Sequence, residues 1–273
     1  MPLVTGGGFC GSVAAKVDRH RRAEGFQDYT RMSSSSESRP AKIEVRITSD
    51  NICPWCFVGK RSIEQASKHF GDELDVTIKW YPFYLAPGWP DEGVVVNTKN
   101  HLNKHFGGGA FEGLVTNLGL VNEHYGLGIK WNINDSSVMF NTRASHTLLA
   151  AAGTQSNAVQ NRLIELLFQK YFERNEDLRH IDDLEKAGRE AGIGEELIHL
   201  WKVGKFDDIV RQQTESNAER GVKGVPYFEI WMEGENTPVV LCGGQSPKAF
   251  IEAFDTLLSA SEEDYGLLEN WVY

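Results

Sequence analysis

The chain has 273 residues, of which 41% are hydrophobic and 24% are charged. This length allows one large domain or one domain with a sizeable insertion, and the apolar content is sufficient for a buried core. The net charge of −10 makes the phosphate backbone of nucleic acids an unfavourable partner. The apolar runs are only a few residues long, so we expect no membrane-spanning helix and no membrane partner.

The segment 1–40 is expected to be disordered. It contains a glycine run at Gly6–Gly8 and a serine run at Ser33–Ser36, and it shows no sustained helical or strand periodicity. Glycines and charges interrupt the early apolar residues, so we expect no secretory signal, and the low cysteine usage favours the cytoplasm. A mitochondrial transit peptide is the alternative, because basic residues cluster in this segment, although acidic residues are interspersed among them.

The folded part is predicted to begin with a βαβ unit. Hydrophobic and polar residues alternate in Lys42–Thr48 and again in Leu74–Trp80, which is the pattern of strands. Between these segments, apolar residues recur at helical spacing from Phe57 and stop before Gly71, a favourable residue at a helix C-terminus. With the usual handedness of the crossover, the two strands are parallel.

A helical block is expected to follow. No segment between 99 and 205 shows a convincing strand pattern, and Val159–Tyr171 has the spacing of an amphipathic helix. Further helices are predicted near 110–124, 139–152, 181–191, 194–202 and 206–221.

Strand character returns at Pro226–Trp231 and Pro238–Leu241, and the turn between them predicts a hairpin. Ser246 and Pro247 then suit the N-cap and the first position of a last helix. We therefore predict an α/β fold in the order β-α-β, helical insertion, α, β-β-α. Its parts are a core at 41–90 and 206–260, an all-helical insertion at 91–205 and an acidic tail at 261–273.

The strongest chemical signal is Cys53-Pro54-Trp55-Cys56 at the start of the first helix. Two cysteines at this spacing can close a disulfide, and free N–H groups at a helix N-terminus favour a thiolate. We expect Cys53 to be the exposed nucleophile and Cys56 to be the shielded resolving thiol. A zinc site and a pair of unreactive core cysteines are the alternatives, but zinc needs four ligands and no second CxxC follows.

A second signal is Gly224-Val225-Pro226, directly before a predicted strand. Proline belongs at the first position of a strand, because it cannot donate a hydrogen bond to the sheet. A cis proline here would turn the backbone of Val225 toward a ligand, and an ordinary trans proline is the alternative.

Together these residues resemble the DsbA-like thioredoxin-fold oxidoreductases, and most closely the FrnE-like branch of that family. The resemblance covers about residues 42–258. It is carried by the segments Ser49–Lys60, Trp80–Pro87, Asn141–His146, Leu167–Phe172, Gly221–Phe228 and Gly243–Pro247. It implies a thioredoxin-like fold with a helical domain inserted after the second strand.

The resemblance also implies roles for individual residues. Cys53 would form a mixed disulfide with the substrate, and Cys56 would resolve it. Pro226 would be a cis proline, and the backbone of Val225 would hold the substrate beside the sulfur pair. The dipeptide Pro54-Trp55 would set the redox potential.

Four further side chains have predicted positions. Phe83 and His146 are candidates for substrate contacts. Core packing is the alternative for Phe83, and a satisfied or surface histidine is the alternative for His146. Cys242 is expected to be a small buried hydrophobe at a strand end, with a third redox cysteine as the alternative, and Cys10 is expected to have no role.

The predicted function is therefore thiol–disulfide oxidoreductase, acting on protein or small-molecule thiols and disulfides. We expect no metal and no cofactor besides the redox-active disulfide, with glutathione as a candidate co-substrate, and the sequence leaves a homodimer open. The first alternative is a glutathione-dependent isomerase or transferase of the kappa or 2-hydroxychromene-2-carboxylate isomerase type, against which the second cysteine argues. The second alternative is a binding or chaperone-like module that uses the cleft between core and insertion.

Overall fold

The computed structural model describes residues 39–89 and 95–268, with side chains described as far as residue 259. Most of the segment predicted to be disordered, including Cys10, lies outside the described residues. Within the described ranges, no helix combines the length and the apolar character needed to cross a membrane.

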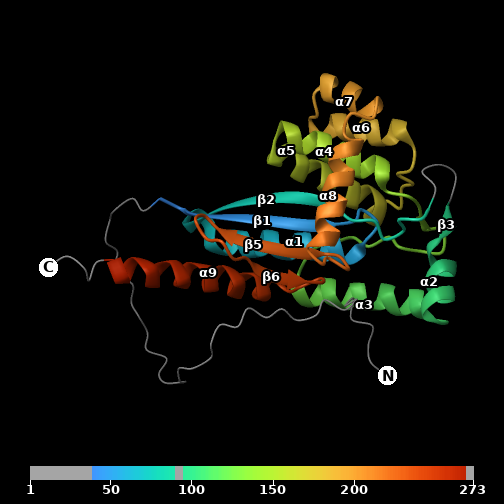
Figure 1. Cartoon of the computed structure of the whole chain (residues 1–273). Helices are drawn as coiled ribbons and strands as arrows, with labels where there is room; N and C mark the ends of the chain where they lie inside the picture. Colours follow the sequence, from blue (N-terminus) through green and yellow to red (C-terminus); the bar gives the residue numbers. More distant parts are fainter. Residues whose placement is uncertain (1–38, 90–94, 269–273) are drawn as a thin grey trace.

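A four-stranded sheet forms the centre of the fold (Figure 1). β1 (Ala41–Ser49) lies between β2 (Leu74–Pro82) and β5 (Tyr227–Met232), and β6 (Val239–Cys242) follows β5 at the edge. β1 and β2 are parallel, whereas β5 is antiparallel to both β1 and β6. The predicted βαβ unit and the predicted hairpin are both confirmed, and together they form a thioredoxin-like core.

One face of this sheet is apolar, because alternate residues of each strand point to it. On β1 these residues are Ile43, Val45 and Ile47, which are all buried. The strand register places Ile78 of β2 and Ile230 of β5 on either side of Val45. The alternation seen in the sequence therefore corresponds to one continuous buried layer.

Two neighbouring helices, α1 (Pro54–Phe70) and α9 (Pro247–Leu268), pack together with this core. The ring of Phe228 on β5 meets Phe250 of α9 edge-on, with 4.8 Å between ring centroids. The same ring lies 2.6 Å from the position that a Cβ on Gly59 would occupy. Glycine at this position therefore lets α1 approach the sheet closely.

The start of α9 agrees with the sequence. The Ser246 hydroxyl accepts a hydrogen bond from the Ala249 N–H at 3.2 Å, and Pro247 is the first helical residue. The helix continues to Leu268, so the backbone of the segment predicted to be an acidic tail is helical as far as that residue.

The chain between β2 and β5 is mainly helical, as predicted. A π-helical segment, Gln169–Glu173, continues α5. The α-helices are α2 (Thr98–Phe106), α3 (Ala110–Tyr125), α4 (Arg143–Gln155), α5 (Asn157–Phe168), α6 (Ile181–Ala191), α7 (Glu195–Lys202) and α8 (Asp207–Glu219).

Two details of this block differ from the prediction. The expectation that it contains no strands is wrong, because β4 (Val138–Met139) pairs antiparallel with β3 (Val96–Asn97). Strands of two residues are too short to show alternation, so the sequence pattern could not reveal them. Helix α2 is not among the predicted helices, because its residues are mostly polar and show no clear apolar stripe.

Helix α5 covers the free edge of the sheet at β2. The Gln160 side-chain amide bonds to both backbone groups of Trp80, accepting from its N–H at 3.0 Å and donating to its carbonyl oxygen at 3.1 Å. The Asn161 amide donates to the carbonyl oxygen of Ile78 at 3.1 Å. These side chains satisfy groups that an open strand edge would expose, and they fix the insertion to the core.

A cluster of charged side chains joins α1 to α5. The Lys60 side chain is 3% exposed, and its Nζ lies 2.7 Å from Oε2 of Glu165. Lys60 also pairs with Glu64 one turn along α1, and Arg61 pairs with the other carboxylate oxygen of Glu165. A buried ammonium group is costly unless it is paired, so Glu165 compensates for the burial of Lys60.

Candidate active site

Cys53 and Cys56 lie at the junction between the end of β1 and the start of α1, as predicted. After β1 the chain makes a tight turn in which the Cys53 N–H donates to the Asp50 carbonyl oxygen at 3.0 Å. Cys53 is the N-cap residue of α1, and Pro54 occupies the first turn, where its missing N–H costs no hydrogen bond. The Cys56 N–H donates to the Cys53 carbonyl oxygen at 3.0 Å, which places the two cysteines on adjacent parts of one turn.

The two thiols differ in their surroundings. Cys56 is fully buried, which agrees with the shielded position predicted for it. Cys53 is 4% exposed, so the expectation of an exposed nucleophile is wrong, because residues of both the core and the helical insertion surround it. Cys53 nevertheless lines a cavity of about 850 Å³, through which a ligand can reach it.

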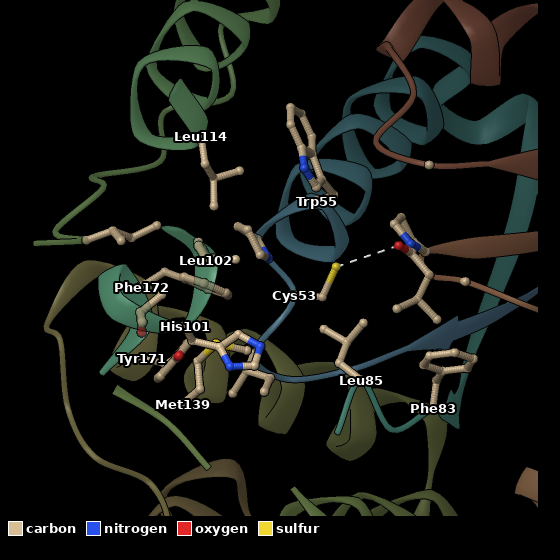
Figure 2. Close-up of a pocket in the computed structure, with 18 of the residues that line it drawn as sticks. Cys53, Trp55, Phe83, Leu85, His101, Leu102, Leu114, Met139, Tyr171 and Phe172 are labelled. Carbon is tan, nitrogen blue, oxygen red and sulfur yellow. Dashed lines mark hydrogen bonds between the residues drawn. The ribbon is translucent and has the colours of Figure 1, made fainter. Parts of the chain in front are cut away.

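The Val225–Pro226 peptide bond is cis, as expected from the resemblance. This places the Val225 carbonyl oxygen 3.7 Å from the Cys53 sulfur, as a dashed line shows in Figure 2. The Pro226 carbonyl oxygen accepts a hydrogen bond at 2.8 Å from the N–H of Gly243, which continues the β5–β6 pairing. Segments far apart in the sequence thus meet at the sulfur atom of Cys53.

Burial raises the pKa of the Cys56 thiol well above its ordinary value, and the neighbouring Cys53 raises it further. A hydrogen bond to Ser49 and one to the Asp50 backbone act in the opposite direction and are outweighed. Cys56 is therefore a neutral thiol at neutral pH in the reduced protein.

This raised pKa predicts a loss of stability at alkaline pH. Above about pH 8.5 the unfolded chain loses the Cys56 proton, whereas the folded protein retains it, so the free energy of unfolding falls as pH rises. Urea unfolding of the reduced protein at about pH 7 and about pH 9.5 should show this loss, and Cys56→Ser should lose less over the same interval. Equal losses in the two proteins would contradict this assignment.

A buried polar group lies behind the cysteines. Asp50 is fully buried, and one of its carboxylate oxygens accepts from the Leu85 N–H at 2.8 Å. His146 Nε2 lies 2.9 Å from the Phe83 carbonyl oxygen, to which it donates, and 3.7 Å from the Asp50 carboxylate. Asn51 donates to Ser145 in the same region. These contacts tie the turn before Cys53 to helix α4 and to the segment after β2.

His146 thus occupies a different place from the one predicted for a substrate contact. His146 is 4% exposed, and it does not line the cavity beside Cys53. Its contacts suit a positioning residue, since they hold the Phe83 backbone and face Asp50. Phe83 itself lines the cavity, as do Pro54 and Trp55.

The Trp55 ring is held by a close approach of the backbone. A Cβ on Gly244 would lie 2.7 Å from the Trp55 ring, so only glycine allows the loop between β6 and α9 to pass at this distance. Gly243 beside it has a φ of 80°, which also favours glycine. The Gly-Gly pair therefore shapes the wall next to the cysteines.

Several residues of the cavity are missing from the sequence prediction. Cys242 lies at the end of β6, as predicted, but it is half-buried rather than buried, and it lines the cavity with Cys53. The register of β5 and β6, which pairs Cys242 with Tyr227, brings it there. His101 and Lys223 also line the cavity. The proximity of Lys223 to Gly-Val-Pro was a usable signal, whereas nothing in the sequence placed His101 near Cys53.

Comparisons with known proteins agree with this geometry. The model of the DSBA-like thioredoxin domain family matches residues 44–255. The chain therefore belongs to the DSBA-like thioredoxin domain family. The uncharacterized protein YwbO of Bacillus subtilis (strain 168) is 26% identical over 193 residues, which cover 69% of this chain and 86% of YwbO.

Solved structures show the same fold. A probable DsbA oxidoreductase from Streptomyces coelicolor aligns with a TM-score of 0.67 and 23% identity, over 80% of this chain and 90% of its own. The cytosolic disulfide reductase DsbM from Pseudomonas aeruginosa aligns with a TM-score of 0.53 and 14% identity, over 80% of this chain and 99% of its own. These likenesses show that the chain shares this fold, in agreement with the family match.

Proposed function

We propose that the protein is a thiol–disulfide oxidoreductase that exchanges its Cys53–Cys56 dithiol and disulfide with thiol or disulfide substrates. The observation that supports this proposal is that Cys53 lies at the N-terminus of α1 and faces a cavity, while Cys56 is buried one turn further along. This is the arrangement that a nucleophilic and a resolving thiol require, since only one sulfur is accessible to a substrate.

The reaction consists of two exchanges. In the reducing direction, the Cys53 thiolate attacks one sulfur of the substrate disulfide, forms a mixed disulfide and releases the other substrate sulfur as a thiol. Cys56, after losing its proton, then attacks the Cys53 sulfur and releases the second substrate thiol. The protein finishes as the Cys53–Cys56 disulfide, so two electrons have passed to the substrate.

The surrounding residues suit supporting roles in this reaction. The Val225 carbonyl group and Pro226 flank the Cys53 sulfur and would contact the bound substrate, together with Phe83. Pro54 and Trp55 would influence the redox potential, because they decide how the Cys53 sulfur is shielded. His146 would act indirectly, through the backbone of Phe83.

We further propose the cytoplasm as the compartment and glutathione as a co-substrate. The low cysteine content supports a reducing compartment. DsbM, which has the same fold, is named as a cytosolic protein and has also been solved with GSH. No other cofactor is required, because the redox-active disulfide itself carries the electrons.

A redox titration tests the proposed function. The full chain is equilibrated in glutathione buffers of varied ratio, and its free thiols are trapped with a mass-tagged alkylating agent. We expect one reversible two-electron transition at Cys53 and Cys56, with a midpoint within the range of about −270 to −120 mV that this fold spans. The absence of a Cys53–Cys56 disulfide in every buffer would refute the proposal.

The same titration separates the proposal from a glutathione-dependent isomerase or transferase. The cavity also suits an enzyme of that kind, because it can hold a small substrate beside Cys53. Such an enzyme would show at most a glutathione adduct on Cys53, and Cys56→Ser would leave its turnover intact, since it needs no resolving thiol.

A further inference from the structure

The cavity beside Cys53 has the size of a small-molecule site. Its volume of about 850 Å³ lies within the range of about 300–1,000 Å³ that is usual for such sites. Its walls come from α1 and the Gly-Val-Pro segment on one side and from α2, α3 and β4 of the insertion on the other (Figure 2). The insertion thus converts the surface beside the cysteines into a chamber.

The inner surface of this chamber is mainly apolar. From the insertion, Leu102, Leu114 and Met139 contribute to the wall, and from the core side Phe83 and Leu85 do so. In Figure 2, Leu102, Leu114 and Met139 lie on one side of Cys53, and Leu85 and Phe83 lie on the other. A ligand that fills the chamber would therefore bury apolar surface, which is favourable.

The chamber carries little charge. Among its described lining residues, Lys223 is the one with a permanently charged side chain. Burial lowers the pKa of His101, and the positive charges of His105 and Lys104 lower it further, so His101 is a neutral imidazole at neutral pH. The net charge of −10 also disfavours the approach of anions.

Two polar groups on α2 mark one part of the wall. Thr98 and His101 lie three residues apart and so share one side of the helix. The Thr98 hydroxyl is buried, and it lies close enough to the Tyr171 hydroxyl to offset part of the rise in pKa that burial causes in that group. A ligand with one polar group could bond there while the rest of it contacts apolar side chains.

We propose that the substrate of this site is a small, uncharged and largely apolar thiol or disulfide, of which the aromatic ones fit best, bound whole inside the chamber with its sulfur at Cys53. This inference rests on the proposed oxidoreductase function and names its substrate class. A disulfide of a folded protein does not suit the site, because Cys53 is only 4% exposed. Glutathione, as the co-substrate, would react at Cys53 without filling the chamber, because its two carboxylates would have Lys223 as their one permanent countercharge among the described lining residues.

Single-turnover kinetics test the substrate class. The reduced full chain is mixed with 4,4′-dithiodipyridine, which is uncharged, with 5,5′-dithiobis(2-nitrobenzoate), which is doubly negative, or with glutathione disulfide. Each rate constant is divided by that of free dithiothreitol with the same disulfide, which removes differences in intrinsic reactivity. We expect this ratio to be at least about tenfold higher for 4,4′-dithiodipyridine than for either anionic disulfide. We also expect the rate with 4,4′-dithiodipyridine to saturate as the concentration of this disulfide is raised. Equal ratios, or a higher ratio for either anionic disulfide, would overturn the inference.

A pair of variants on α3 locates the binding. Leu114→Trp fills part of the chamber and should lower the ratio for 4,4′-dithiodipyridine about tenfold, with little change for the smaller 2-hydroxyethyl disulfide. Leu120→Trp is the matched control, because Leu120 is on the same helix and 61% exposed, and it should have no effect. An unchanged ratio in Leu114→Trp would overturn the inference. If this variant does not fold, the saturation test in the unmodified chain decides whether the inference stands.

The redox titration distinguishes the two possible failures. If Cys53 and Cys56 form no disulfide, the proposed function fails and the substrate class fails with it. If the two-electron transition is present but the chamber shows no preference for uncharged aromatic disulfides, the substrate inference alone is wrong.

Discussion

Replacement of Cys53 by serine is expected to abolish thiol–disulfide exchange, whereas replacement of Cys56 by serine is expected to stop the reaction halfway. Cys53 is the thiol that faces the cavity, so its loss removes the attacking sulfur, and the rate should fall on the order of 10³-fold or more. In Cys56→Ser the first exchange still occurs, but no resolving thiol remains, so a mixed disulfide should accumulate.

Intact-protein mass spectrometry after mixing with a disulfide distinguishes these outcomes. Cys56→Ser should carry one substrate adduct, Cys53→Ser should carry none at that position, and the unmodified chain should finish as an internal disulfide. Cys10→Ser provides the control, because it removes a thiol outside the motif, and it should behave as the unmodified chain does. Sustained exchange by Cys53→Ser would exclude the assigned nucleophile.

The second large effect is on stability, and it concerns Glu165. Glu165→Gln should lower the free energy of unfolding by about 1–3 kcal/mol, because the buried Lys60 ammonium loses one of its two carboxylate partners and keeps only Glu64. The affected group is Lys60, whose ammonium lies 2.7 Å from the Glu165 carboxylate and whose side chain is 3% exposed. Glu64 alone would then face Lys60 and Arg61.

Chemical denaturation of the reduced proteins measures this loss, and an exposed pair supplies the control. Glu252→Gln removes a partner of Lys248 on α9, where both side chains are largely exposed, and it should change the unfolding midpoint by no measurable amount. Equal stability of Glu165→Gln and the unmodified chain would show that the cluster does not hold α1 to α5.

The core of this fold could be read from the sequence because its signals are local. Alternation around Val45 and Ile78 predicted the two parallel strands, and the helix that follows the CxxC motif ends where Gly71 predicts it. The cysteine pair could be placed for the same reason, since the end of a strand and the start of a helix meet within a few residues. The cis bond before Pro226 was expected through family resemblance rather than through a physical pattern.

The chamber could not be read from the sequence, because it forms between elements that are distant along the chain. His101 and Leu114 face Cys53 only through the packing of α2 and α3 against the core, and no periodicity encodes that packing. Cys242 reaches the same space through strand register, where a shift of one residue would turn it to the other face. For the same reason the low exposure of Cys53 was not foreseen.

The 172 residues that separate Cys53 from Val225 have a consequence for biosynthesis. As the ribosome releases the chain, β1, α1 and β2 can assemble first, with the CxxC motif already present. The antiparallel partner of β1 and the carbonyl group beside the Cys53 sulfur arrive only after the whole insertion has been translated. Contacts between such remote segments form late, because closing a long loop is entropically costly. The nascent chain therefore carries the cysteine pair, for which we propose redox activity, before the cavity around it has formed. A reducing compartment would protect the two thiols during that interval.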